Sequence, residues 1–261
     1  MLPPRVALAK GLDDATCDRR WEELSSRYTH RSPADYGGLL SEWQALEKEC
    51  GTTQRYKPRL ALTYYYLDRP QDAKRVLASI GSSGQQESLT ELVQILVDIS
   101  LLSDAGKLDE TALLQLEQRL QTFATHHPTD VVGMSLLADV ISERGRFDVA
   151  IELYEKALSA IGPSRRAANL LRNLTVTYSR AHRYEAAYDT ADKAITYNKD
   201  LLSDMFFVCA VARAQASIGK IENAKDTLTV LAVKNPEVKQ QQEFKSAVAF
   251  VIEKSKSAGQ H

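Results

Sequence analysis

The chain has 261 residues, of which 44% are hydrophobic and 26% are charged, and its net charge at pH 7 is −1. This near-neutral charge argues against a protein whose whole surface binds polyanions. No stretch approaches the ~20 consecutive apolar residues that span a bilayer. Glycine and proline are sparse, at 12 and 8 residues, which favours long helices joined by short turns.

The N-terminal segment, residues 14–51, is predicted to form an atypical pair of helices. On the first helix, Trp21, Leu24 and Tyr28 follow helical spacing. The second helix carries a broader apolar face, which is made of Leu39, Leu40, Trp43 and Leu46. The pair lacks the small residues that mark the later units, so its packing is expected to differ from theirs.

Residues 54–128 are predicted to form degenerate helical repeats. The first pair turns at Asp68–Gln71 and is followed at Gly81–Gly84 by the clearest loop in the chain. Its apolar residues at helical spacing are Leu60, Ala61, Tyr64, Ala73, Leu77 and Ile80. The next pair turns at Gly106, and its second helix is expected to be long and to end at the His126-His127-Pro128 sequence.

Four short strings recur with nearly constant spacing. They are Gly106-Lys-Leu-Asp109, Gly145-Arg-Phe-Asp148, His182-Arg-Tyr-Glu185 and Gly219-Lys-Ile-Glu222, with starts 39, 37 and 37 residues apart. Glycine can adopt the left-handed conformation that ends a helix, and an acid near the start of the next helix suits the helix dipole. A period of this length is typical of stacked helical pairs, with these strings as the bends.

Residues 131–236 contain three clear units of this kind. Ala150, Ala187 and Ala224 recur at steps of 37 residues on the second helices, where small side chains let two antiparallel helices approach closely. An amphipathic helix over 239–256 follows, and its apolar face comprises Phe244, Val248, Val251 and Ile252. We expect this helix to cap the last repeat, and the tail Ser257–His261 to be disordered.

These units resemble the tetratricopeptide repeat, a helix–turn–helix of 34 residues. Its small positions hold Ala138, Ala150 and Ala157, its aromatic position holds Tyr154, and Pro163 lies one place from its proline. The resemblance implies an all-α, right-handed α-solenoid of about five to six antiparallel helical pairs with a C-terminal capping helix. It implies one superhelical domain over residues 1–261, and a non-catalytic scaffold or adaptor that binds a peptide or helix of a partner protein in its concave groove.

In this family certain positions of each first helix face the groove, and the resemblance carries this role to specific residues here. Asn169, Arg172 and Asn173 offer two amides and a guanidinium, groups that suit an extended peptide backbone or a carboxylate. A solvated helix face is the alternative interpretation of the same residues. The remaining candidates for partner binding are Val176, Arg180, Ser135, Asp139, Arg213, Tyr65 and Tyr66. For Tyr65 and Tyr66, packing against the Gly81–Gly84 loop is an equal alternative.

No pattern in the chain indicates catalysis, a cofactor or a metal. Phosphate loops, nucleotide fingerprints and hydrolase or metalloprotease strings are absent. His126 and His127 are adjacent, so on a helix they point about 100° apart and do not form a metal face. The three cysteines are odd in number and widely spaced, which argues against a disulfide framework and a zinc site. Cys209 lies in an apolar helical run and is expected in the core.

Charge is distributed unevenly along the chain. Residues 81–164 carry 13 acidic and 5 basic side chains, a net charge of −8, while residues 165–261 carry 10 and 15, a net charge of +5. Ordinary surface variation explains this pattern, and so does complementarity to a partner or a second copy. The alternative function is therefore self-assembly as a homo-oligomer, with a possible homodimer, or assistance in assembling a larger complex. Nucleic acid and membrane insertion are not expected.

The expected compartment follows from the N-terminus, which lacks an apolar stretch of signal-peptide length. This favours a cytoplasmic protein. A periplasmic location stays open if a leader has been removed.

Overall fold

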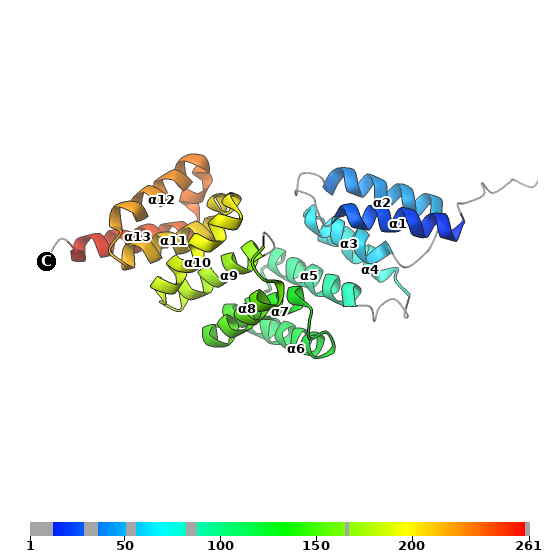
Figure 1. Cartoon of the computed structure of the whole chain (residues 1–261), viewed down its shortest axis with the longest axis horizontal. Coiled ribbons are helices and arrows are strands. Elements are labelled where there is room, and N and C mark those ends of the chain that lie inside the picture. Colours follow the sequence, from blue (N-terminus) through cyan, green and yellow to red (C-terminus); the bar gives the residue numbers. More distant parts are fainter. Residues whose placement is uncertain (1–12, 29–35, 51–55, 82–87, 165–166, 259–261) are drawn as a thin grey trace, which may run out of the picture. The chain divides into compact units, whose positions relative to one another are not determined.

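Helices form every regular element of the part of the chain that this computed structural model describes, namely residues 13–28, 36–50, 56–81, 88–164 and 167–258. Thirteen of the described helices are α-helices, and two, over residues 199–203 and 236–240, are short 3-10 helices. Figure 1 shows how the helices follow one another along the chain. The predicted all-α repeat fold is confirmed. The helices group into two compact units, Met1–Ala112 and Leu113–His261.

The N-terminal unit contains two helical pairs and one further long helix. The helices are α1 (Asp14–Tyr28), α2 (Tyr36–Cys50), α3 (Lys57–Tyr66), α4 (Pro70–Ala78) and α5 (Ser88–Asp104). The four apolar residues predicted for the second helix are all buried on α2. Of the residues predicted for the first helix, Leu24 is buried, while the side chain of Tyr28 lies outside the described part. Most of the loop predicted at Gly81–Gly84 also lies outside it.

The C-terminal unit contains most of α6 and every later element. Its helices are α6 (Glu110–His126), α7 (Val131–Glu143), α8 (Phe147–Ile161), α9 (Ala167–Arg180), α10 (Tyr184–Tyr197), η3 (Lys199–Ser203), α11 (Met205–Ser217), α12 (Ile221–Lys234), η4 (Pro236–Gln240) and α13 (Gln242–Ala258). Helices α7 to α12 form the three predicted pairs. Helix α13 includes Ser257 and Ala258, so the prediction of a disordered tail was wrong for those two residues.

The bends share one backbone geometry, including the bend that lacks glycine. Asp68, Gly106, Gly145, His182 and Gly219 all have φ between 57° and 83°. In each bend the next N–H donates to the carbonyl oxygen five residues earlier, over 2.8–3.1 Å, as in a Schellman motif. His182 therefore adopts the left-handed conformation of its glycine counterparts, which an L-residue other than glycine adopts at a cost of about 1–2 kcal/mol.

The basic residue of each recurring string in the C-terminal unit joins neighbouring pairs. Arg146 donates to Glu117 over 2.6 Å and Arg183 donates to Asp148 over 2.6 Å. Lys220 donates to the Tyr188 hydroxyl over 2.9 Å. Each partner belongs to the second helix of the preceding pair. The strings thus form the bend and also connect one repeat to the one before it.

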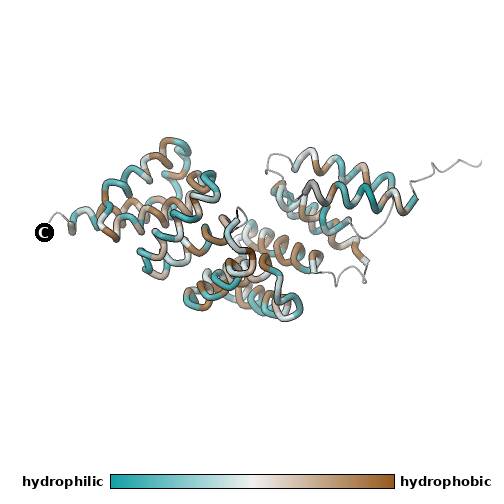
Figure 2. Tube along the Cα trace, in the orientation of Figure 1, coloured by the Kyte–Doolittle hydropathy of each residue, from teal (hydrophilic) through white to brown (hydrophobic). Residues whose placement is uncertain are grey.

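Small residues set the distance between packed helices, as the sequence predicts. Ala150, Ala187 and Ala224 are fully buried on the second helices. At the start of α7, a Cβ added to Gly133 would overlap the ring of Phe123 on α6. Figure 2 shows apolar and polar residues alternating along the helices, which is the pattern expected when one face of each helix is buried.

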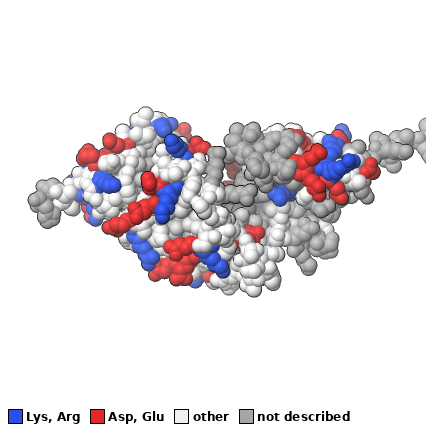
Figure 3. All heavy atoms as spheres, viewed as in Figure 1, with Lys and Arg blue, Asp and Glu red and all other residues white. Residues whose placement is uncertain are grey.

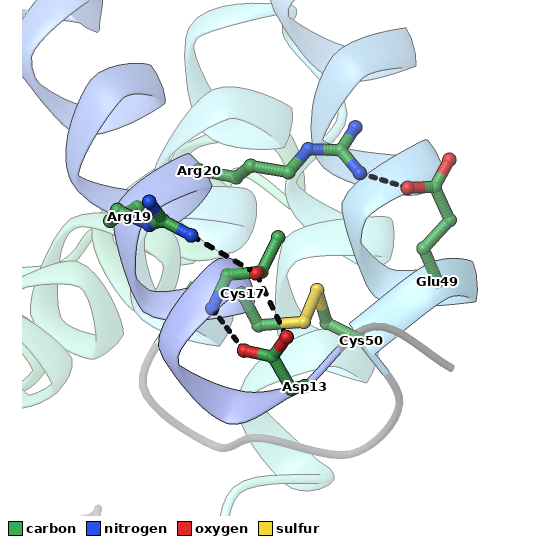
Figure 4. The surroundings of a disulfide bond; sticks show 7 residues. Asp13, Cys17, Arg19, Arg20, Glu49 and Cys50 are labelled. Carbon is green, nitrogen blue, oxygen red and sulfur yellow. Dashed lines mark hydrogen bonds and ion pairs between the residues drawn. A yellow bond between two sulfur atoms is a disulfide. The ribbon is translucent and has the colours of Figure 1, made fainter. Parts of the chain in front are cut away.

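The cysteine prediction is corrected by the structure. Cys17 and Cys50 form a disulfide with a Cα–Cα distance of 5.7 Å, which joins the first turn of α1 to the last residue of α2 (Figure 4). Sequence spacing could not reveal this pair, because the two residues meet only when α1 and α2 pack antiparallel. Cys209 is free and buried as predicted, and burial raises the pKa of its thiol to about 12.

Candidate functional site

The C-terminal unit contains a groove of 780 Å³ along its first helices. We call it the concave groove. Helices α7, α9, α11 and α13 supply most of its lining, and the bends and second helices supply the rest. The lining residues are Glu143, Phe147, Arg172, Val176, Ser179, Arg180, His182, Tyr184, Phe206, Ala210, Arg213, Glu243, Ser246 and Phe250.

Aromatic side chains form one part of this lining. Phe206 at the start of α11 is 50% exposed although it is a large apolar residue. The rings of Tyr184 and Phe250 lie 5.6 Å apart between centroids, and Nδ1 of His182 lies 2.7 Å from the Tyr184 hydroxyl oxygen. Aromatic residues combine large contact area with few rotatable bonds, so they are effective anchors in protein interfaces.

Ion pairs between neighbouring repeats form the other part. Arg180 of α9 donates to both carboxylate oxygens of Glu143 on α7, over 2.6 and 3.0 Å. Arg213 of α11 donates to one carboxylate oxygen, Oε1, of Glu243 on α13. The hydrogen bonds that Arg180 donates to Glu143, then the charges of Glu143 and Glu243, raise the pKa of Arg180 against the opposing effect of burial. The two arginines thus lie on the neighbouring helices α9 and α11, the two glutamates lie on the flanking helices α7 and α13, and each arginine has a carboxylate partner.

A half-buried polar network borders the groove and joins three repeats. Arg172 donates to both carboxylate oxygens of Asp204 over 2.8 Å and to Oδ1 of Asn173 over 3.0 Å. Nδ2 of Asn173 donates to Oδ1 of Asp139 over 2.8 Å, and the Tyr154 hydroxyl donates to the same oxygen. Asp204 also caps α11 by accepting from the Phe207 N–H. The network therefore holds the start of α11 against α9 and α7.

Burial raises the pKa of Asp139 to about 6, and the hydrogen bonds from Tyr154 and Asn173 with the charge of Arg172 only partly oppose it. An unfolded aspartate has a pKa near 3.9, so the folded state binds this proton more tightly than the unfolded state. The free energy of unfolding should therefore fall as the pH rises from about 4 to 6, and the full cost of ionisation is present above pH 6.

Asp139→Asn should remove this cost while keeping an oxygen that can accept from Tyr154. We expect the variant to be more stable than the wild type by about 1–2 kcal/mol at pH 7.5, with little difference at pH 4.5. Thermal unfolding followed by far-UV circular dichroism at both pH values measures this. A lower melting temperature of Asp139→Asn at pH 7.5 would contradict the expectation.

The structure brings some predicted site residues together and separates others. Arg172, Val176, Arg180 and Arg213 line the concave groove, and Asp139 and Asn173 belong to the network beside it. Asn169 is exposed and Ser135 is half-buried, and neither is part of the lining.

The two predicted tyrosines lie in the N-terminal unit. Tyr66 stacks on Tyr36 of α2 with ring centroids 4.9 Å apart, and it contacts the edge of the Tyr65 ring. Tyr66 nonetheless keeps 49% of its surface exposed. These tyrosines belong to a different unit from the concave groove, so they are a separate candidate surface.

Several lining residues were not predicted. Phe147 and Tyr184 begin the second helices, and Glu243 and Phe250 belong to the capping helix. The repeat period could have identified Phe250, because it lies 37 residues after the predicted groove residue Arg213, which itself lies 37 residues after Val176. We applied that step only to the three clear repeats, so the contribution of the capping helix to the groove was missed.

The described residues contain no group of three or more His, Cys, Asp or Glu side chains that could hold a metal ion. His126 is the last residue of α6 and His127 follows it, with ring centroids 6.4 Å apart, and the His127 ring lies 4.6 Å from the Phe123 ring between centroids. Among the helices that the structure describes, none is long and apolar enough to cross a membrane.

Comparisons with known proteins agree with this architecture. Residues 130–200 match the family model of the tetratricopeptide repeat. The crystal structure of the APC/C hetero-tetramer Cut9-Hcn1 aligns with 84% of this chain at 14% identity and a TM-score of 0.67. This chain spans only 40% of that longer one. No curated protein sequence matches.

Two further similar structures align with this chain over almost their whole length. The type IV pilus biogenesis factor PilW aligns with 90% of this chain and 100% of its own, at 12% identity and a TM-score of 0.62. PilF of Pseudomonas aeruginosa aligns with 89% and 98%, at 13% identity and a TM-score of 0.61. At these identities the likeness concerns the fold alone.

The fold and the groove define an all-α helical-repeat protein built from stacked antiparallel pairs. The predicted resemblance to the tetratricopeptide repeat is confirmed over residues 130–200, which the family model matches.

Proposed function

We propose that the chain is a non-catalytic interaction scaffold that binds a peptide or helix of a partner protein in the concave groove. The observation that carries this proposal is the exposed Phe206 in a groove of 780 Å³ that also contains Tyr184 and Phe250. An apolar partner side chain that covers these rings would remove apolar surface from water, which stabilises a complex by about 25 cal/mol per Å² before the costs of association.

The charged residues of the groove do not favour a partner that is uniformly acidic or uniformly basic. The three lining arginines are each paired with a carboxylate of the chain, as described above, so a partner carboxylate would have to compete with Glu143, Asp204 or Glu243. In the view of Figure 3, acidic and basic side chains are interspersed over the C-terminal unit. We therefore infer a partner that places aromatic or aliphatic anchors between polar residues of both signs.

Arg172 and Asn173 keep their predicted role as residues beside the docked partner. Both side chains also hold neighbouring repeats together through Asp204 and Asp139. Replacing them would change the stability of the unit as well as binding. Phe206 is a cleaner probe, because its exposed ring contributes less to folding than a buried one.

Phe206→Asp should reduce partner binding about tenfold or more, since it places a charge where apolar surface is covered. The tagged chain would be used to capture partners from an extract of the source organism, followed by quantitative mass spectrometry. Val149→Asp is the matched control, since Val149 is 40% exposed on α8 and is not part of the lining. Equal capture of the same partners by Phe206→Asp and the wild type would place the binding surface elsewhere.

The disulfide bears on the compartment. Disulfides persist in oxidising compartments and are rare in the cytosol. We infer from the Cys17–Cys50 pair that the chain works in an oxidising compartment, which is the second of the two locations that the sequence left open.

A further inference from the structure

The three arginines that line the concave groove differ in how completely their guanidinium groups are paired. Arg172 donates from Nε, Nη1 and Nη2, and Arg180 donates from both Nη atoms to Glu143. Arg213 donates only from Nη1, to Oε1 of Glu243. Among the residues that the structure describes, Nε and Nη2 of Arg213 have no hydrogen-bond partner. Arg213 therefore keeps one edge of its guanidinium, formed by these two atoms, for a ligand.

Arg172 shows what this edge of a guanidinium binds in the same unit. Its Nε and Nη2 donate to Oδ2 and Oδ1 of Asp204, over 3.1 and 2.8 Å. Two parallel N–H donors match the two oxygens of a carboxylate, so an arginine fixes the orientation of the carboxylate as well as its charge. A partner carboxylate placed against Nε and Nη2 of Arg213 would form the same pair.

Arg213 lies beside aromatic rings and is largely shielded from water. Burial raises the pKa of Tyr184, and the positive charge of Arg213 opposes this effect, so the guanidinium lies close to the Tyr184 ring. The Tyr184 ring in turn lies 5.6 Å from the Phe250 ring between centroids. The side chain of Arg213 is only 15% exposed. Salt screens a partly buried ion pair less than an exposed one, so a carboxylate bound here keeps its attraction at physiological ionic strength.

The charges near Arg213 favour a ligand group with a single negative charge. The hydrogen bonds to Glu143 raise the pKa of Arg180, and the charges of Glu143 and Glu243 add to this effect, so both carboxylates lie near the arginine pair. They would repel a phosphorylated side chain, which carries about −1.5 to −2 charges at pH 7, more strongly than a carboxylate. The chemistry at Arg213 is therefore that of an aspartate or glutamate.

Arg213 lies within the groove and not at one of its ends. Helix α11 contacts both α9 and α13, and the lining continues onto Val176 of α9 and Phe250 of α13. On α11 itself, Phe206, Ala210 and Arg213 follow the i, i+4, i+7 spacing of one face, so Phe206 and Arg213 are about 10 Å apart along the helix axis. A bound segment can therefore continue past Arg213 in both directions, which favours a side-chain carboxylate over a chain terminus.

We propose that Arg213 binds an internal aspartate or glutamate side chain of the partner segment, about 10 Å from the apolar residue that covers Phe206. This role of Arg213 rests on the proposed function, because both use the concave groove. It names the chemistry of the bound segment: one acidic residue and one aromatic or large aliphatic residue at a fixed separation. Glu243 is the residue with which the partner carboxylate competes for Arg213.

Selection from a library of random peptides tests this chemistry without knowledge of the partner. Short peptides displayed on phage with no free C-terminus would be selected on the immobilised full chain. We expect the enriched peptides to share an apolar residue and an acidic residue at a constant separation. The best peptide, amidated at its C-terminus, and its Asp→Asn or Glu→Gln analogue would then be titrated by fluorescence anisotropy. The amide analogue should bind about tenfold more weakly.

Two substitutions in the chain should change this binding in opposite directions. Arg213→Gln should weaken binding of the acidic peptide about tenfold and binding of the amide analogue less than about twofold, since only the acidic peptide loses an ion pair. Glu243→Gln should tighten binding of the acidic peptide about threefold or more, because it removes the competing carboxylate and keeps Arg213. A side chain that only supported the fold would not give this gain. Glu222→Gln is the matched control, since it changes the net charge equally on α12 outside the lining.

The outcomes separate this inference from the proposed function. Enriched peptides that lose binding in Phe206→Asp but share no acidic residue would overturn the role of Arg213 and leave the proposed function in place. Binding of the acidic peptide that Glu243→Gln weakens or leaves unchanged would also overturn it. Absence of any enriched peptide that depends on Phe206 would count against both. The amide analogue probes the same contact from the peptide side, so the test does not depend on the folding of Arg213→Gln.

Discussion

Loss of the Cys17–Cys50 disulfide is expected to destabilise the N-terminal unit by about 3–4 kcal/mol. The bond joins residues 33 positions apart, so it removes a large amount of chain entropy from the unfolded state. Arg20 and Glu49 form an ion pair beside it (Figure 4). That pair is largely exposed and contributes little, so it cannot replace the covalent link between α1 and α2.

The two tryptophans of the chain allow the stability of the N-terminal unit to be measured separately. Trp21 lies on α1 and Trp43 on α2, so tryptophan fluorescence during urea unfolding reports the helices that the disulfide joins. The double variant Cys17→Ser, Cys50→Ser should unfold at lower urea, and reductant should shift the wild type but leave the variant unchanged. Alkylation of protein trapped at extraction should label one cysteine, Cys209; labelling of all three would contradict both the bond and the oxidising compartment.

Glu117→Ala is expected to destabilise the C-terminal unit by about 3–5 kcal/mol. Glu117 is only 3% exposed and forms ion pairs with Arg144 and Arg146, while Gln121 donates to it over 2.9 Å. Removing the carboxylate breaks the ion pairs that Glu117 forms with Arg144 and Arg146, and breaking a buried ion pair by removing one partner is costly. The same change also breaks the link between α6 and the bend at Gly145.

The pH dependence provides a second test of the same carboxylate. Burial opposes its ionisation, but the hydrogen bonds and charges of Arg144 and Arg146 outweigh burial and lower the pKa of Glu117. A lowered pKa in the folded state means that this stabilisation is present above the unfolded pKa, near 4.3, and is lost as the pH falls through the folded value. The difference between the wild type and Glu117→Ala should therefore shrink below about pH 4.

Far-UV circular dichroism reports the helices of both units, whereas the tryptophans report only the N-terminal unit. A shift of the dichroism transition without a shift of the fluorescence transition therefore assigns the effect to the C-terminal unit. Glu117→Met combined with Arg144→Met is the control, since it removes both charges and should cost less than Glu117→Ala alone. If the double variant were the less stable of the two, the effect of Glu117→Ala would come from lost packing rather than from the broken ion pair with Arg144.

The helical pairs could be predicted from sequence because local rules agree with one another there. Glycines or their substitutes at 106, 145, 182 and 219 end helices, and alanines at 150, 187 and 224 set the helix spacing. Both signals are periodic, so each unit supports the interpretation of the next. His182 shows that the residue type alone does not identify every bend, because the backbone keeps the left-handed conformation where histidine replaces glycine.

The sequence identified some residues of the groove lining, but not which of their side chains are already paired. Positions on the first helices could be found by counting, and Arg172, Val176, Arg180 and Arg213 are in the lining as expected. Whether a polar side chain is available to a partner depends on what faces it from the next repeat. Asn173 and Arg172 look free in the sequence, but Asp139 and Asp204 lie 34 and 32 residues away and accept their hydrogen bonds.

By itself, the sequence determined the helical-repeat class, the period, the bends and the small residues between packed helices, since each of these is set within one helix–turn–helix unit and recurs in the next. Only the tertiary structure decided which cysteines meet and which arginines are already paired. Those properties depend on side chains from different helices that approach in space, as Cys17 does with Cys50 and Arg180 with Glu143.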